Sequence, residues 1–328
     1  MRILFGIMSA VQPAQTVGSL VDALGTRHPI LIHHDWSQQP DFTLSRSNVA
    51  YVENPQRTGW ADWGFSQGIL RLVSAAMERE RFDYFQLLSP TCLPVRPTEA
   101  FEAHLAAQGA DFLVDAVRLD SDPHVLMSHG WRAFAAAGSL RHRALRRARK
   151  WYFGKNTEGV SRNGLAFPVG SMVDAGGVAA MLARIGHGLT RQASRGNGFR
   201  HPFDSAFPCY AGSTWFTASW RGCEHLLERA RDDALTRSFA RMHMGDEMYF
   251  PSIFMNSGMP CAPAAHYIAR FVDARPTWLD ESDFDEIQRS GAFFARKFPE
   301  DPASPVRTAV RALLVPPGRR VEPVDQTS

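Results

Sequence analysis

The chain has 328 residues, of which 45% are hydrophobic and 21% charged, and its formal net charge is +3 at pH 7. These values are typical of a globular protein, exclude a disordered or collagen-like chain, and give no case for nucleic acid as a main partner. Since no stretch reaches the roughly 18 uninterrupted apolar residues of a membrane-spanning helix, and no cleavable leader pattern follows the first residues, we expect a cytoplasmic protein.

Strands and helices are expected to alternate through the first third of the chain. Short apolar runs predict strands at residues 3–9, 29–33, 48–52, 84–88 and 112–117. Apolar residues at helical spacing predict helices at residues 13–24, 65–79 and 98–108. Such alternation favours an α/β fold whose mainly parallel sheet carries helices on both faces and binds ligands beyond the carboxyl ends of its strands.

The second half of the chain is less regular. Residues 120–207 are rich in Arg, Gly and His and predict an insertion of loops and helices beside the sheet, where an acceptor site is expected. Regularity returns with GSTWFTAS at 212–219, a helix from 224 to 230 and a second helix beginning near Gly245. We expect one domain over residues 1–300, followed at 301–328 by a C-terminal helix and a disordered tail.

Four short segments combine charged with aromatic side chains. They are HHDW at 33–36, TGWADWGFS at 58–66, GDEMYF at 245–250 and FFARKF at 293–298. A sugar nucleotide needs an aromatic or apolar wall for its base, hydrogen-bond acceptors for the imide and ribose, and positive charge for the diphosphate. These segments offer all three kinds of group.

The charged pairs within these segments have two interpretations each. Asp246 and Glu247 at the start of a helix are either a general base with its neighbour or acidic residues that the helix macrodipole favours. Arg296 and Lys297 either bind phosphate or extend from a packed surface.

Two patterns in the middle of the chain suggest further partners. Asp120 and Asp122 form the DxD pattern with which many sugar-nucleotide enzymes hold a divalent cation between the donor phosphates, so a metal-dependent transferase is an alternative. The run RHRALRRARKWYFGK at 141–155 holds seven basic residues. This run either makes peripheral contact with an anionic membrane or forms a solvated helix face.

Taken in chain order, six segments resemble the core-2/I-branching β-1,6-N-acetylglucosaminyltransferase and peptide xylosyltransferase family of inverting glycosyltransferases. They are ILIHHD, WADWGFS, YFQLLSPTCLP, GSTWF, DEMYF and FFARKF. They are similar to the IHVD strand end, WGG(F/W)S, YFxxLSxxxxP, GSxWF, DExxF and FARKF motifs of that family. The resemblance spans residues 3–298 and is weakest over 120–207.

The resemblance implies a GT-A type fold and transfer of a sugar, GlcNAc or xylose, from a UDP-sugar. Asp35 and Trp60 are then expected in the uridine pocket, and Arg275 and Lys297 at the donor diphosphate in place of a metal ion. Glu247 matches the catalytic base of the family. No metal or other cofactor is implied.

The acceptor side matches the family less well. Asp115 lies near the position of an acceptor-side carboxylate, and Asp246 is expected to cap the helix or orient the acceptor. Residues 90–92 replace a GQD sequence and leave no carboxylate for a metal, and Ala274 stands where animal branching enzymes have an acceptor-contacting Trp. The expected acceptor is a glycan or polysaccharide hydroxyl, and a non-catalytic sugar-nucleotide or glycan-binding relative is a further alternative.

Overall fold

The fold is taken from a computed structural model. It describes residues 1–121, 123–153, 158–162, 165–168, 181, 185, 201–268, 270–272 and 275–314.

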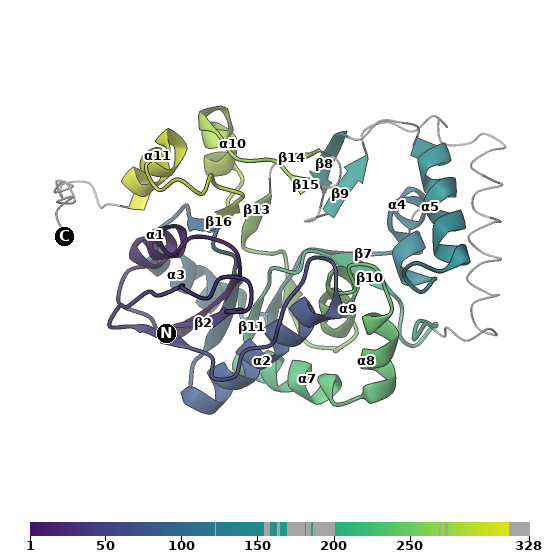
Figure 1. The fold of residues 1–328 in the computed structure, drawn as a ribbon, viewed down its shortest axis with the longest axis horizontal. Coiled ribbons are helices and arrows are strands. Elements are labelled where there is room, and N and C mark those ends of the chain that lie inside the picture. Colours follow the sequence, from purple (N-terminus) through teal and green to yellow (C-terminus); the bar gives the residue numbers. More distant parts are fainter. Residues whose placement is uncertain are drawn as a thin grey trace.

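A seven-stranded sheet forms the centre of the molecule (Figure 1). Its strands, in spatial order, are β3 (Val49–Tyr51), β2 (Ile30–His34), β1 (Ile3–Ser9), β4 (Tyr84–Leu88), β11 (Thr217–Ser219), β6 (Phe112–Leu113) and β12 (Cys261–Ala262). All neighbouring pairs are parallel except those of β11, which runs antiparallel to both β4 and β6. The predicted α/β fold with a mainly parallel sheet is therefore confirmed.

Helices cover both faces of this sheet. Along β1, Leu4 and Met8 join one core, whereas Ile3, Phe5 and Ile7 join the other, because successive side chains of a strand point to opposite faces. The first core takes the apolar faces of α2 (Trp63–Arg79), α7 (Trp220–Ala230) and α9 (Asp246–Met255). The second takes those of α1 (Ala14–Leu24) and α3 (Thr98–Gln108).

The strand predicted at 112–117 is divided in the structure. Residues Phe112–Leu113 form β6 of the central sheet, whereas β7 (Ala116–Arg118) pairs with β10 (Tyr210–Gly212) in a separate ladder. The division falls at Asp115, whose carboxylate accepts a hydrogen bond from the Ala264 backbone N–H at 3.0 Å. The chain leaves the central sheet at this point.

Two smaller sheets lie beside the central one. The first joins β13 (His266–Ile268), β16 (Phe294–Arg296) and β5 (Leu93–Pro94). The second joins β15 (Arg275–Pro276), β14 (Arg270–Val272), β8 (Glu158–Arg162) and β9 (Leu165–Pro168). The Phe298 N–H donates to the Thr91 carbonyl at 2.9 Å, so the FFARKF segment is joined to the turn that follows β4.

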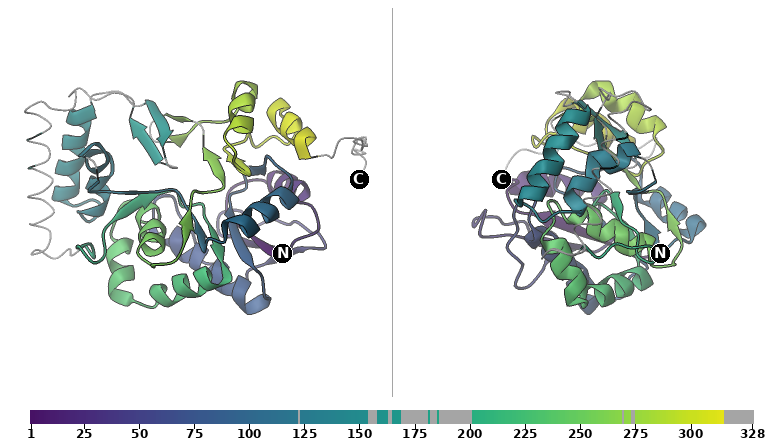
Figure 2. Two further views of the ribbon diagram at one scale, coloured as in Figure 1. Left: turned by 180° about the vertical axis from the view of Figure 1, so that it is seen from behind. Right: turned by 90° about the vertical axis from the view of Figure 1, so that its right-hand side faces the viewer.

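The insertion contributes two helices, α4 (Pro123–Ala133) and α5 (Leu140–Phe153), which pack on each other at one end of the long axis (Figures 1 and 2). The remaining helices are α8 (Asp233–Ala240), the 3-10 turn η1 (Glu281–Asp283), α10 (Phe284–Arg289) and α11 (Pro305–Leu314). None of the helices in the described ranges combines the length and apolarity needed to cross a membrane. The tail predicted to be disordered, from residue 316, lies outside the described residues.

Candidate active site

A cavity of about 240 Å³ lies beyond the carboxyl ends of the central strands. It is lined by Gly59, Trp60, Ala61, Phe65, Ser213, Thr214, Trp215, Met244, Asp246, Glu247, Phe271, Pro276 and Arg296. The Leu87 N–H donates to the Phe216 carbonyl at 3.0 Å, which places Trp215 level with the end of β4. Four segments that the sequence singled out, TGWADWGFS, GSTWF, GDEMYF and FFARKF, therefore meet in one cavity.

Asp35 organises the loop that carries one wall of this cavity. Directly after β2, its carboxylate accepts hydrogen bonds from the backbone N–H groups of Ser37 and Thr58 at 3.1 and 2.7 Å, and from the Gln38 amide at 2.7 Å. Burial opposes its charge, but these donors together hold its pKa well below the ordinary value. Since Thr58 precedes the cavity-lining Gly59, Asp35 fixes the loop, and its contact with uridine remains a prediction.

Two tryptophans stand at the cavity in different environments. Trp60 is 75% exposed, and its ring meets that of His243 edge-on with centroids 6.2 Å apart. Trp215 is buried and packs against Phe65. An exposed indole at the rim of a cavity is suited to stack on a nucleobase, whereas a buried one shapes the floor.

The backbone takes an unusual conformation on two sides of the cavity. Ala61 has φ +61° and Met244 has φ +53°, and Asn54 is the one other non-glycine residue with positive φ in the part of the chain that the structure describes. Such conformations are uncommon for residues with a Cβ atom and cluster at ligand sites. Ala61 follows Trp60, and Met244 leads into the helix that carries Glu247.

The first turn of α9 places two carboxylates at the cavity, where the helix macrodipole favours negative charge. Asp246 accepts a hydrogen bond from the Thr214 hydroxyl at 2.6 Å. Glu247 is paired with Arg132 of α4, whose Nη1 donates to its Oε2. Asp246 is thus held by a hydrogen bond from the GSTWF loop, and Glu247 by an ion pair with the insertion.

The two carboxylates differ from exposed acids in their protonation. Burial raises the pKa of Glu247, the Arg132 guanidinium opposes that rise, and the neighbouring Asp246 adds to it. Burial also raises the pKa of Asp246, against the hydrogen bond from Thr214. The Glu247 side chain is 24% exposed, so an acceptor can reach it. A reachable carboxylate with a raised pKa is well suited to remove a proton from a hydroxyl.

Arg296, at the end of β16, is the one cation among the described residues that line the cavity. Its guanidinium lies 4.8 Å from the centre of the Trp215 ring, and its Nε has no hydrogen-bond partner among the described residues. The next residue, Lys297, places its ammonium 3.8 Å from the centre of the Trp278 ring. Arg275 lies in β15 beside the lining residue Pro276, and its side chain is outside what the structure describes.

Two residues on the acceptor side have contacts that position the site: Asp115, which the sequence marked, and Arg132, which it did not. The carbonyl of Asp115 accepts the Ser213 N–H at 3.1 Å, so Asp115 supports the GSTWF loop, and burial raises the pKa of its carboxyl group. Arg132 received no role from the sequence, because its contact with Glu247 joins residues 115 positions apart. No local motif signals that pair. Ala274, where the family has a Trp, lies outside the described residues.

Of the two residues named for metal binding, the structure describes Asp120. In the described part of the chain, no three His, Cys, Asp or Glu side chains lie close enough together to hold a metal ion. The Asp120 carboxylate is paired with the Arg118 guanidinium, and Asp122 lies outside the described residues. Metal dependence is therefore a question for activity measurements.

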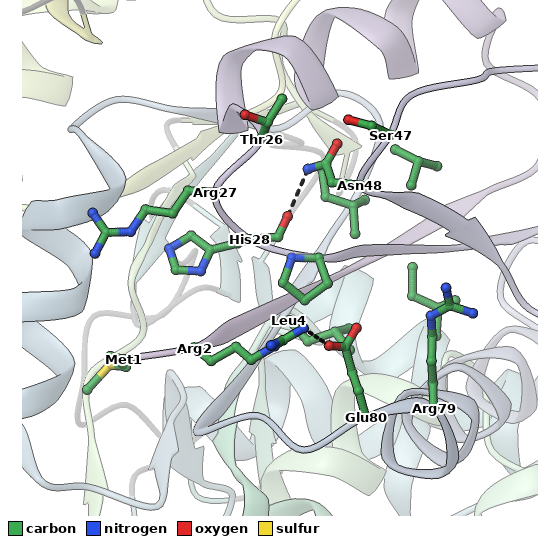
Figure 3. Close-up of a pocket in the computed structure, with 14 residues that line it drawn as sticks. Met1, Arg2, Leu4, Thr26, Arg27, His28, Ser47, Asn48, Arg79 and Glu80 are labelled. Atoms are coloured by element: carbon green, nitrogen blue, oxygen red, sulfur yellow. Dashed lines mark hydrogen bonds and ion pairs between the residues drawn. The ribbon is translucent and has the colours of Figure 1, made fainter.

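A second cavity, of about 370 Å³, opens at the amino edge of the sheet (Figure 3). Across it Arg2 pairs with Glu80, and the Asn48 amide donates to the His28 carbonyl at 2.8 Å. These contacts tie its walls to one another. Because open parallel sheets bind ligands beyond the carboxyl ends of their strands, the cavity at Glu247 is the candidate active site.

No protein-family model and no curated protein matches the chain. Among solved structures it is similar to S. aureus TarS 1–349, with 10% identity, a TM-score of 0.24 and coverage of 35% of each chain. It is also similar to apo mouse xyloside xylosyltransferase 1, with 10% identity, a TM-score of 0.35 and coverage of 89% of this chain and 97% of that one. At these values the function rests on the geometry of the site itself.

Proposed function

We propose that this protein is an inverting glycosyltransferase that moves a sugar, GlcNAc or xylose, from a UDP-sugar to a carbohydrate hydroxyl without a metal ion. The observation that carries the proposal is the convergence of four separate segments on one cavity. They supply the exposed ring of Trp60, the carboxylate of Glu247 and the guanidinium of Arg296. In that order, these groups suit a nucleobase, a reacting hydroxyl and a diphosphate. The resemblance of the same segments to one glycosyltransferase family supports this assignment.

In the proposed reaction, Glu247 removes the proton of the acceptor hydroxyl while the hydroxyl oxygen bonds to the anomeric carbon of the donor. The bond between that carbon and the UDP oxygen breaks, and UDP leaves with the electron pair. Because the attack comes from the face opposite UDP, the configuration inverts. Negative charge grows on the departing diphosphate, where Arg296, together with Lys297 and Arg275 as predicted, stabilises it as fixed cations.

The proposal is tested by incubating the protein with UDP-GlcNAc, UDP-xylose and UDP-glucose, in EDTA and separately in manganese, and measuring release of UDP. We expect turnover of one donor in EDTA. Turnover in manganese alone would replace the metal-free mechanism with the alternative that uses Asp120 and Asp122. Binding of UDP with no turnover under any condition would assign a binding-only role.

The activity is expected to fall as the pH drops through the pKa of Glu247, because only the deprotonated carboxylate accepts the hydroxyl proton. Since burial raises this pKa, the acidic limb of kcat/KM should lie above the usual glutamate value. Arg132 favours the charged carboxylate, so Arg132→Gln should move the limb to higher pH. Arg132→Lys, which keeps the charge, should move it less, and an unchanged profile in Arg132→Gln would contradict the pairing.

Trp60→Ala is expected to weaken UDP binding without destabilising the fold. The side chain is 75% exposed, so its loss should change the free energy of unfolding by no more than about 0.5 kcal/mol. Lost stacking on uracil should cost about 1–3 kcal/mol of binding free energy. Calorimetry with UDP measures the loss, and Trp60→Phe, which keeps an aromatic face, should recover part of it.

A further inference from the structure

Three arginines of the insertion lie close to one another, and we name them the arginine cluster: Arg132 of α4, which contacts Glu247, and Arg146 and Arg149 of α5. Arg132 donates a hydrogen bond to Glu247, and the Arg146 guanidinium lies 5.9 Å from the centre of the Trp131 ring. The Nε of Arg149 donates to the Ser128 carbonyl at 3.1 Å. The cluster therefore spans both helices and extends outward from the candidate catalytic base.

The positive charge of the cluster exceeds the negative charge that meets it. Within the described part of the chain, Glu247 is the one carboxylate paired with any of the three arginines. Burial, with Arg132 and Arg146 nearby, lowers the pKa of Arg149 to about 10, so all three remain cationic at neutral pH. His243 beside them stays neutral, because burial and the same cations lower its pKa to about 4.

The innermost member also has unused hydrogen-bonding capacity. Arg132 is 7% exposed, and its Nε has no hydrogen-bond partner among the described residues. The Nε2 of His142, packed against Trp131 beside the cluster, is likewise buried without a partner in those residues. An unpaired buried donor such as the Arg132 Nε–H and cations without matching acids are costly, and an anion placed beside them gains charge-assisted hydrogen bonds.

We propose that the arginine cluster binds a negatively charged group of the acceptor glycan, a carboxylate or a sulfate, and thereby brings the acceptor hydroxyl to Glu247. The inference rests on the proposed function and adds the class of acceptor to it. A small anionic substituent fits a cluster whose members Arg132 and Arg149 are largely covered, whereas a flat headgroup surface reaches only exposed side chains. Arg146 is exposed at the outer edge of the cluster, as are Arg143, Arg147 and Lys150 on the same helix.

The test measures binding of matched acidic and neutral glycans by calorimetry. The pairs are a glucuronate oligosaccharide with its carboxyl-reduced glucose counterpart, and a sulfated galactose oligosaccharide with its desulfated counterpart. The wild type should bind one acidic member roughly tenfold more tightly than its neutral partner. Arg146→Gln and Arg149→Gln should remove this preference, whereas Arg147→Gln, an exposed control on the same helix, should retain it. Far-UV circular dichroism confirms that each variant is folded.

Two outcomes would overturn the inference. One is the lack of any preference for an acidic glycan, and the other is an equal loss of preference in Arg147→Gln, which would indicate unspecific attraction. Binding to phosphatidylserine vesicles in place of acidic glycans would assign α5 to a membrane surface. UDP release by the wild type is measured in parallel, so that a failed proposed function, with acidic glycans bound but no donor turned over, is distinguished from a failed inference.

Discussion

Glu247→Gln is expected to lower sugar transfer roughly 100- to 10,000-fold while leaving UDP affinity nearly unchanged. The amide keeps the size of the side chain and a hydrogen-bond acceptor, but it cannot take the hydroxyl proton. Because Glu247 also pairs with Arg132, the variant must first be shown to unfold at a temperature close to that of the wild type. Steady-state transfer and calorimetry with UDP then separate a loss of chemistry from a loss of donor binding.

Asp246→Asn is the matched control for this prediction. Both carboxylates begin α9 and both line the cavity, but the Asp246 carboxylate already accepts the Thr214 hydroxyl at 2.6 Å. Its replacement should reduce transfer less than tenfold, because an amide still accepts that hydrogen bond. A larger loss in Asp246→Asn than in Glu247→Gln would identify Asp246 as the base instead.

Arg296→Gln is expected to weaken UDP binding roughly 10- to 100-fold, the range for a lost hydrogen bond to a charged group. The guanidinium lines the cavity and lies on the Trp215 ring, so it is held in place before the donor arrives. Binding of uridine, which lacks the diphosphate, should change little in the same variant. An equal loss for uridine and UDP would indicate that Arg296 shapes the cavity rather than neutralising the phosphates.

Lys297→Ala tests the cation that the family resemblance points to. Its ammonium lies on the Trp278 ring, and it follows Arg296 directly. Weaker UDP binding is expected, because the donor phosphates lose one cation. If Lys297→Ala leaves UDP affinity unchanged while Arg296→Gln lowers it, the phosphate contact belongs to Arg296 alone.

The regular part of the fold could be predicted from sequence because its pattern is local. The strand at 84–88 and the helix at 98–108 were expected with the bounds that the structure gives to β4 and α3. The strand at 112–117 was not expected to divide, because the contact that divides it joins Asp115 to Ala264. Hydrophobic periodicity carries no information about a partner so far along the chain.

The candidate site shows the same contrast. Trp60, Glu247 and Arg296 lie in segments that stand out by their mixture of charge and aromatic residues, and the structure brings them together. Arg132 does not stand out, because its importance comes from a pairing across two helices. The contact between the insertion and Glu247 therefore became visible only in three dimensions.

The most direct test of the account is a calorimetric titration of UDP, in EDTA, into the wild type and into the variants Trp60→Ala and Arg296→Gln. The wild type is expected to bind UDP without a metal, and each variant is expected to bind it more weakly. Failure of the wild type to bind UDP under these conditions, or equal affinity in all three proteins, would contradict the placement of a UDP-sugar in this cavity.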